Sequence, residues 1–210
     1  GVQTCALPIL FDAEGRLSIT TAENAASFAF ATMLADKGYA PQEPTAALVS
    51  QLFNEGRAAF AINGPWMMGE IEKGVDYVVA PIPRNARSGL ASSPYLTVEA
   101  LLLSSQAKHH AKALRFAQFL AEESGARTRA TIGAQAVAFR FAPETAPAQD
   151  AHLKGFAELV GQAMPMPNAP IMRTLWEPLA QALRKSLRHA ETPASALEAA
   201  KRQIAIYTRP

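Results

Sequence analysis

Residues 58–68, Ala-Ala-Phe-Ala-Ile-Asn-Gly-Pro-Trp-Met-Met, join an apolar run of strand length to the start of a helix. The run ends at Asn63 and Gly64, a turn-forming pair, and Pro65 stands where a first helical residue tolerates a missing N–H. Trp66 is therefore expected at a strand-to-helix corner. Such corners line clefts at the carboxyl ends of strands in α/β sheets, where small ligands bind. A tryptophan buried in a hydrophobic core is the alternative interpretation.

A second tryptophan, Trp176, follows a proline-rich stretch at residues 164–170. Three segments resemble the maltose/maltodextrin-binding proteins of ABC sugar importers in their order, spacing and chemistry. They are Ala-Ile-Asn-Gly-Pro-Trp at 61–66, Val-Asp-Tyr-Val-Val-Ala-Pro-Ile-Pro at 75–83, and Met-Pro-Asn-Ala-Pro-Ile-Met running into Leu-Trp at 166–176. The resemblance extends over residues 11–206.

The resemblance implies an α/β protein with the two-lobe periplasmic-binding-protein fold of the class II type, of which only the C-terminal part is present. Residues 10–97 would belong to the C-terminal lobe, 98–148 would cross to the N-terminal lobe, and 149–206 would return. Residues 207–210 would be a tail or the start of a linker. Because the crossing segment would lack partners for its apolar faces, we expect the isolated chain to be unstable or incompletely folded.

The spacing of apolar residues supports an alternation of helices and strands, which is typical of an α/β layer. Helices are predicted from Thr20 or Thr21 to Gly38, Thr45 to Gly56, Trp66 to Lys73, 107–123, through Ile132, after Asp150, from Pro170 and from Thr192; strands are predicted at 58–62, 77–82 and 98–103. Pro178 is expected to kink its helix or to mark a boundary near Trp176. The predicted inward faces carry Ala26, Phe30, Met33 and Leu34; Ala113, Phe116, Ala117 and Leu120; Met172, Leu175, Leu179 and Leu183; and Leu197, Ala200 and Ile204.

Composition describes a soluble globular chain of 210 residues that is 49% hydrophobic and 18% charged, with a net charge of +2. No cluster of bases is long enough to suggest nucleic acid, and no apolar run is long enough to span a bilayer, so membrane insertion is not expected. Residues 1–9 resemble the translation of a sequencing adapter and are set aside as non-native. They contain the only cysteine, Cys5, so disulfides and thiol chemistry are unsupported, and a signal peptide is not observable.

A sugar presents apolar C–H faces and a rim of hydroxyls, so a sugar site needs flat aromatic platforms and a few fixed polar groups. The resemblance implies that Trp66 and Trp176 stack on sugar rings and that Met166 lines the same cleft. Three positions depart from the maltose-binding pattern and argue against maltose itself: Glu177 replaces an aromatic, Ala180 an arginine and Ala46 a tyrosine.

Signals for an enzyme are weak. His109 and His110 are adjacent and point in different directions, and His152 and His189 are isolated, so solvated or capping roles are expected for all four rather than a metal site. No catalytic residue, cofactor or metal is predicted. A carbohydrate hydrolase that uses Glu99 or Glu177 stays open as an alternative, and so does a binding domain fused to a transporter permease.

The resemblance therefore implies a solute-binding protein that captures maltose- or maltodextrin-like oligosaccharides and delivers them to an ABC importer. Its expected partners are the oligosaccharide and the permease subunits. It is expected to be a monomer outside the cytoplasm, in the periplasm or the extracellular space.

Overall fold

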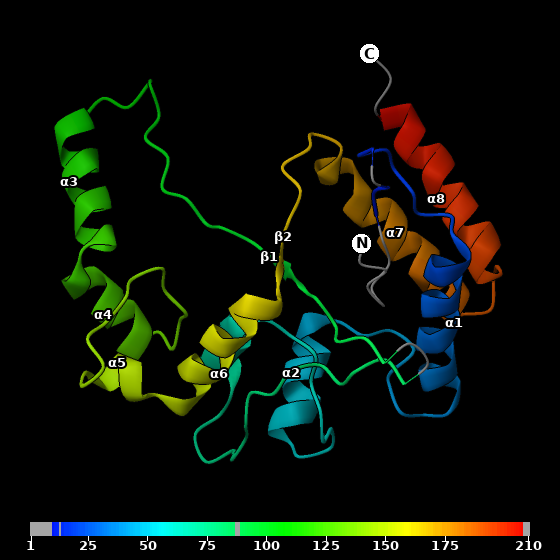
Figure 1. Ribbon diagram of the computed structural model, residues 1–210, viewed down its shortest axis with the longest axis horizontal. Coiled ribbons are helices and arrows are strands. Elements are labelled where there is room, and N and C mark those ends of the chain that lie inside the picture. The colour runs from blue at the N-terminus through cyan, green and yellow to red at the C-terminus, as the bar shows by residue number, and fades with distance from the viewer. Residues whose placement is uncertain (1–9, 13, 87–88, 208–210) are drawn as a thin grey trace. The chain divides into compact units, whose positions relative to one another are not determined.

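The structure is a computed structural model that describes residues 10–12, 14–86 and 89–207, shown as a ribbon in Figure 1. The expectations for residues 1–9 and for 208–210 lie outside these ranges. The chain forms two compact units. Unit 1 comprises Gly1–Thr45, Pro83–Tyr95 and Met164–Pro210, and unit 2 comprises Ala46–Ile82 and Leu96–Ala163. The assignment of residues 10–97, 98–148 and 149–206 to the lobes of a longer protein stays a prediction.

Three helices build unit 1: α1 (Ala22–Asp36), α7 (Met172–Leu187) and α8 (Pro193–Tyr207). Each packs against the other two, and Figure 1 shows them side by side in blue, orange and red. Their shared core contains Leu10, Ile19, Met172, Leu175, Ala182, Ala196, Ala200 and Ile204. The predicted core faces of α7 and α8 are thereby confirmed at their main positions, Leu175, Leu197 and Ile204 among them.

The limits of α1 follow from local chemistry. The hydroxyl oxygen of Thr21 accepts a hydrogen bond from the Asn24 N–H at 3.2 Å, as an N-cap should. At the other end Gly38 has a φ of +71°, a conformation that glycine adopts without steric cost, and the helix stops there. Both ends match the sequence prediction.

The face that α1 buries differs from the prediction. Asn24, Thr32 and Ala35 are buried, whereas Phe30, predicted to face inward, is 59% exposed. Apolar side chains occur on every side of this helix, so the pattern alone did not specify which side meets the core. The contacts of α1 with α7 and α8 determine which side is buried.

Pro178 lies inside α7 and is buried, and the helix continues through it from Met172 to Leu187. The prediction of a boundary near Trp176 is therefore wrong. Pro178 has no N–H, so the carbonyl of Thr174, four residues earlier, loses its donor within the helix. The Thr174 hydroxyl itself donates to the carbonyl of Ile171 at 2.8 Å.

Unit 2 is built of short elements. They are α2 (Ala46–Asn54), the 3₁₀ helix η1 (Pro65–Glu70), α3 (His110–Ala121), α4 (Glu123–Thr131), α5 (Ala146–Gln149), α6 (Ala151–Leu159) and the 3₁₀ helix η2 (Val160–Gln162). From α3 to α6, each helix contacts the next along the chain. The predicted cap of α6 is confirmed, because the Asp150 carboxylate accepts from the Leu153 N–H at 2.8 Å.

The strands predicted at 58–62, 77–82 and 98–103 are not formed: these stretches contain no ladder hydrogen bonds. The strands that the described residues do form are β1 (Tyr95–Leu96) and β2 (Met164–Pro165), which pair in a two-stranded sheet. A strand depends on hydrogen-bonded neighbours, unlike a helix. Phe60 in the 58–62 segment and Leu102 in the 98–103 segment are each 91% exposed, so these side chains are not packed as they would be in a buried strand.

This difference in packing predicts a difference in local stability. None of the residues of α3 is buried, and Phe116, predicted to face inward, is 63% exposed, whereas α8 buries four residues. In the 210-residue chain we expect backbone amides of α3 to exchange with solvent at least about tenfold faster than those of α8, a difference of ~1.4 kcal/mol in opening free energy. Hydrogen exchange followed by mass spectrometry measures this. Equal protection in the two helices would contradict the expectation.

Candidate functional site

Trp66 stands in the first turn of η1, with Pro65 before it and Gly64 as the N-cap. The chain was predicted to continue as a helix to Lys73, but η1 is a 3₁₀ helix and ends at Glu70. Met67 and Met68, next along the chain, are buried, whereas Trp66 is 64% exposed. The corner is therefore anchored by the methionines and presents the indole to solvent.

Polar contacts tie η1 to α2 inside unit 2. The Asn54 side chain donates to the Glu70 carbonyl at 2.9 Å and accepts from the Glu72 N–H at 3.1 Å. The hydroxyl of Ser50, which is buried, donates to the Glu70 carboxylate at 2.5 Å. These bonds join α2 to the side chain and backbone of Glu70, the last residue of η1, and to the backbone of Glu72. The corner that carries Trp66 is therefore fixed to α2.

A second support in unit 2 is a stack of rings that sequence reasoning missed. The rings of Tyr77 and His152 lie parallel with centroids 4.0 Å apart, and Phe53 meets Tyr77 edge-on at 6.2 Å. The His152 Nε2 also lies 3.0 Å from the Tyr77 carbonyl oxygen. Burial raises the pKa of the Tyr77 hydroxyl, and the charge of Asp150 adds to the rise. His152 is thus a packing residue, which corrects the expectation of a solvated or capping histidine.

Trp176 lies on the outer face of α7 in unit 1 and is 55% exposed. The neighbouring Leu175 is completely buried, because successive residues of a helix point about 100° apart. Met166, predicted to line the cleft, is half-buried and packs against the unit 1 core. Whether Trp66, Trp176 and Met166 meet one ligand stays a prediction, since the tryptophans belong to different units.

Two charged residues flank Trp176 on the exposed face of α7. Glu177 turns toward the C-terminal end of the helix, where its Oε1 accepts from Gln181 at 2.9 Å and from Arg184 at 3.0 Å. Arg173, one turn before Trp176, is exposed. The exposed face of α7 near Trp176 therefore carries side chains that can hydrogen-bond to a sugar hydroxyl.

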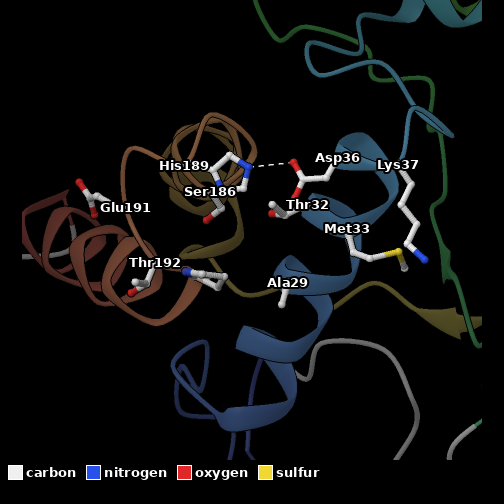
Figure 2. A pocket seen from close by; sticks show the side chains of 10 residues that line it. Ala29, Thr32, Met33, Asp36, Lys37, Ser186, His189, Glu191 and Thr192 are labelled. Carbon is white, nitrogen blue, oxygen red and sulfur yellow. Dashed lines mark hydrogen bonds and ion pairs between the residues drawn. The ribbon is translucent and has the colours of Figure 1, made fainter.

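A groove of about 510 Å³ lies elsewhere in unit 1, between α1 and the α7–α8 turn. Figure 2 shows the ring of His189 pointing across it to Asp36, with Nε2 to Oδ1 at 2.8 Å. His189 follows Arg188, the C-cap of α7, and has a φ of +55°, so the predicted capping role fits this histidine. Ser186, which lines the groove, is roughly 15 Å along the helix from Trp176. None of the three predicted site residues lines this groove.

The hydrolase alternative gains no support from the carboxylates. Glu99 is exposed, and Glu177 is bound by Gln181 and Arg184, so neither sits in the apolar surroundings that make a carboxylic acid a proton donor. Within residues 10–12, 14–86 and 89–207, no three His, Cys, Asp or Glu side chains are grouped as metal ligands would be. No helix in the same ranges has the length and apolar character needed to cross a bilayer.

Comparison with protein families matches residues 7–154 to the model described as bacterial extracellular solute-binding protein. The galactooligosaccharide-binding protein of Bacillus subtilis (strain 168) is 29% identical over 163 residues, which cover 75% of this chain and 38% of that protein. The maltotriose-binding protein of Pyrococcus abyssi (strain GE5 / Orsay) is 27% identical over 161 residues, covering 72% of this chain and 36% of the relative. The chain thus spans little more than a third of the length of these relatives.

Solved structures show the same fold. The maltose/maltodextrin-binding domain MalE from Bdellovibrio bacteriovorus, bound to maltotriose, superposes with a TM-score of 0.83 at 24% identity, over 96% of this chain and 54% of that one. The maltose-maltodextrin binding protein of Alicyclobacillus acidocaldarius gives a TM-score of 0.80 at 20% identity, over 94% of this chain and 56% of that one. The predicted fold class, part of a two-lobe binding-protein fold, is confirmed.

Proposed function

Because the chain belongs to the bacterial extracellular solute-binding proteins, we propose that it forms part of a receptor that captures an oligosaccharide and delivers it to an ABC importer. The observation that carries this proposal is the exposure of both tryptophans, at 64% and 55%, on otherwise anchored elements. Exposed indoles on fixed supports provide the apolar platforms that sugar rings require. In the proposed complex Trp66 and Trp176 stack on sugar rings, and Met166 lines the cleft.

The ligand class follows from chemistry and from the relatives together. Glu177 and Arg173 offer an acceptor and a donor beside Trp176, whereas the maltose-binding pattern has an aromatic at position 177 and an arginine at position 180. The two curated relatives are named for a galactooligosaccharide and for maltotriose. We therefore propose an oligosaccharide of several hexose units rather than maltose.

In the proposed role the protein works outside the cytoplasm as a monomer and does not transform its ligand. Binding between two lobes would favour a closed arrangement, because a ligand shifts an equilibrium only by binding one state more tightly than the other. The closed form would then be recognised by the permease subunits of the importer.

Calorimetric titration tests the proposal. Since the relatives are more than twice as long as the matched part of the chain, the protein to use is the longest natural reading frame that contains residues 10–210. We expect saturable binding of maltotriose or of a galactooligosaccharide, weaker binding of maltose, and no shorter sugars after prolonged incubation. Absence of binding to every oligosaccharide, or release of shorter sugars that Glu177→Gln abolishes, would overturn the receptor proposal.

A further inference from the structure

The benzene ring of the Trp66 indole lies directly against the Cα of Gly64. A Cβ placed on Gly64 would stand 2.3 Å from both Cη2 and Cζ3 of Trp66 and 2.6 Å from Cζ2. Ordinary van der Waals contact begins at about 3.4 Å, so even a methyl group here overlaps the ring by about 1 Å. The indole occupies the space that only the absence of a side chain leaves open.

The backbone of Gly64 does not itself require glycine. Its φ of −98° and ψ of 178° are extended values that any L-residue adopts. The requirement for glycine therefore comes from the ring and not from the turn. This separates Gly64 from Gly38 and Gly56, which have positive φ values and nothing within 4 Å of a built Cβ.

The backbone at Gly64 is held on both sides. Its N–H donates to the Asn63 side-chain oxygen at 2.8 Å, and its carbonyl accepts from the Met67 N–H at 3.1 Å. Trp66, by contrast, is 64% exposed and has room to swing into solvent. If a methyl group is added, the ring is the part that moves, and the corner keeps its fold.

We propose that Gly64 is a positioning residue that seats the Trp66 ring as a sugar platform by leaving room for it against the backbone. The inference rests on the proposed function, since it gives the seated ring the task of stacking on a ligand. A platform gains its affinity from being fixed before the ligand arrives, and a ring that samples several rotamers loses part of it. Gly64 acts through Trp66 and makes no contact with the sugar in this proposal.

The test is a double-mutant cycle measured by calorimetry on the longest natural reading frame that contains residues 10–210. The probe is maltotriose or the galactooligosaccharide, whichever of the two the unmodified protein binds more tightly. Gly64→Ala is expected to weaken affinity about tenfold while Trp66 is present. In the Trp66→Phe background, which lacks the Cη2, Cζ2 and Cζ3 atoms of the indole that create the overlap, the same change is expected to cost less than about threefold. An equal loss in both backgrounds would overturn the proposal.

Gly161→Ala is the matched control, because Gly161 lies in η2 with nothing within 4 Å of a built Cβ and without a positive φ. It is expected to leave affinity unchanged. Thermal unfolding checks that Gly64→Ala folds, and Gly64→Ser supplies a second variant with the same overlap.

A spectroscopic measurement separates this proposal from the proposed function. Trp66 and Trp176 are the two tryptophans of the 210-residue chain. With Trp176 and every tryptophan outside these residues replaced by phenylalanine, the emission reports on the Trp66 ring alone. Gly64→Ala should shift that emission to longer wavelength as the ring leaves the backbone for water. The shift would support the seating of the ring even if no oligosaccharide bound. An unchanged spectrum would overturn the proposal even if the receptor function held.

Discussion

Replacing Trp176 by alanine is expected to weaken oligosaccharide affinity about 30-fold, ~2 kcal/mol, with little change in the stability of unit 1. The indole is 55% exposed on the outer face of α7, so its removal leaves no cavity in the core. Alanine is also the most favourable residue for a helix interior. The loss would therefore come from the missing platform, because a tryptophan that covers a sugar ring buries a large apolar area on binding.

Calorimetry with the tightest-binding oligosaccharide measures the loss, and Phe30→Ala is its control. Phe30 is an aromatic of the same unit, on α1, and its 59% exposure is close to that of Trp176. Because no ligand contact is proposed for Phe30, affinity should stay unchanged when it is removed. Trp66→Ala should weaken binding as Trp176→Ala does. If both tryptophan variants bind as tightly as the unmodified protein, the assigned site is wrong.

The features that the sequence predicts well are those that depend on neighbouring residues. Thr21 and Asp150 cap their helices because a side-chain oxygen reaches a backbone N–H three residues ahead. The core faces of α7 and α8 follow from apolar residues that recur at helical spacing, with polar residues between them. In these cases local chemistry and tertiary packing favour the same structure.

The features that the sequence predicts poorly depend on distant partners. The apolar residues of α1 surround the helix, so its contacts with α7 and α8 select the side that carries Asn24 and Thr32 over the side with Phe30. The run at 58–62 has the composition of a strand, but a strand forms only where another supplies its hydrogen bonds. Neither outcome is encoded within the segment itself.

The candidate site divides in the same way. The motifs placed Trp66 and Trp176 by resemblance, and the structure adds that both are exposed on anchored elements. The stacking of Tyr77 on His152 joins residues 75 positions apart, so no local sequence pattern predicts it. The sequence does show a glycine two residues before the tryptophan, at a corner that contains a proline. The role of Gly64 could not be predicted from this pattern, because it depends on the contact of the Trp66 ring with the Gly64 backbone.

Leu175→Ala is expected to lower the stability of unit 1 and to leave affinity nearly unchanged. Trp176→Ala, at the adjacent residue, is expected to lower affinity and to leave stability nearly unchanged. Leu175 is 0% exposed and lies in the core that α1, α7 and α8 share. Removing three buried carbon atoms loses their transfer free energy and leaves a cavity, which together cost about 2–5 kcal/mol. Since domains are stable by only about 5–15 kcal/mol, unit 1 would lose a large part of its stability.

Urea denaturation measures this loss, and Leu175→Met is the control, because a swap that conserves volume costs less than about 1.5 kcal/mol. At a temperature and urea concentration where unit 1 stays folded, Leu175→Ala should bind its oligosaccharide nearly as tightly as the unmodified protein. The two substitutions therefore separate the faces of α7: the inner face holds the unit together, and the outer face holds the ligand. A stable Leu175→Ala variant would show that the core assigned to α7 is wrong, whatever the ligand data say.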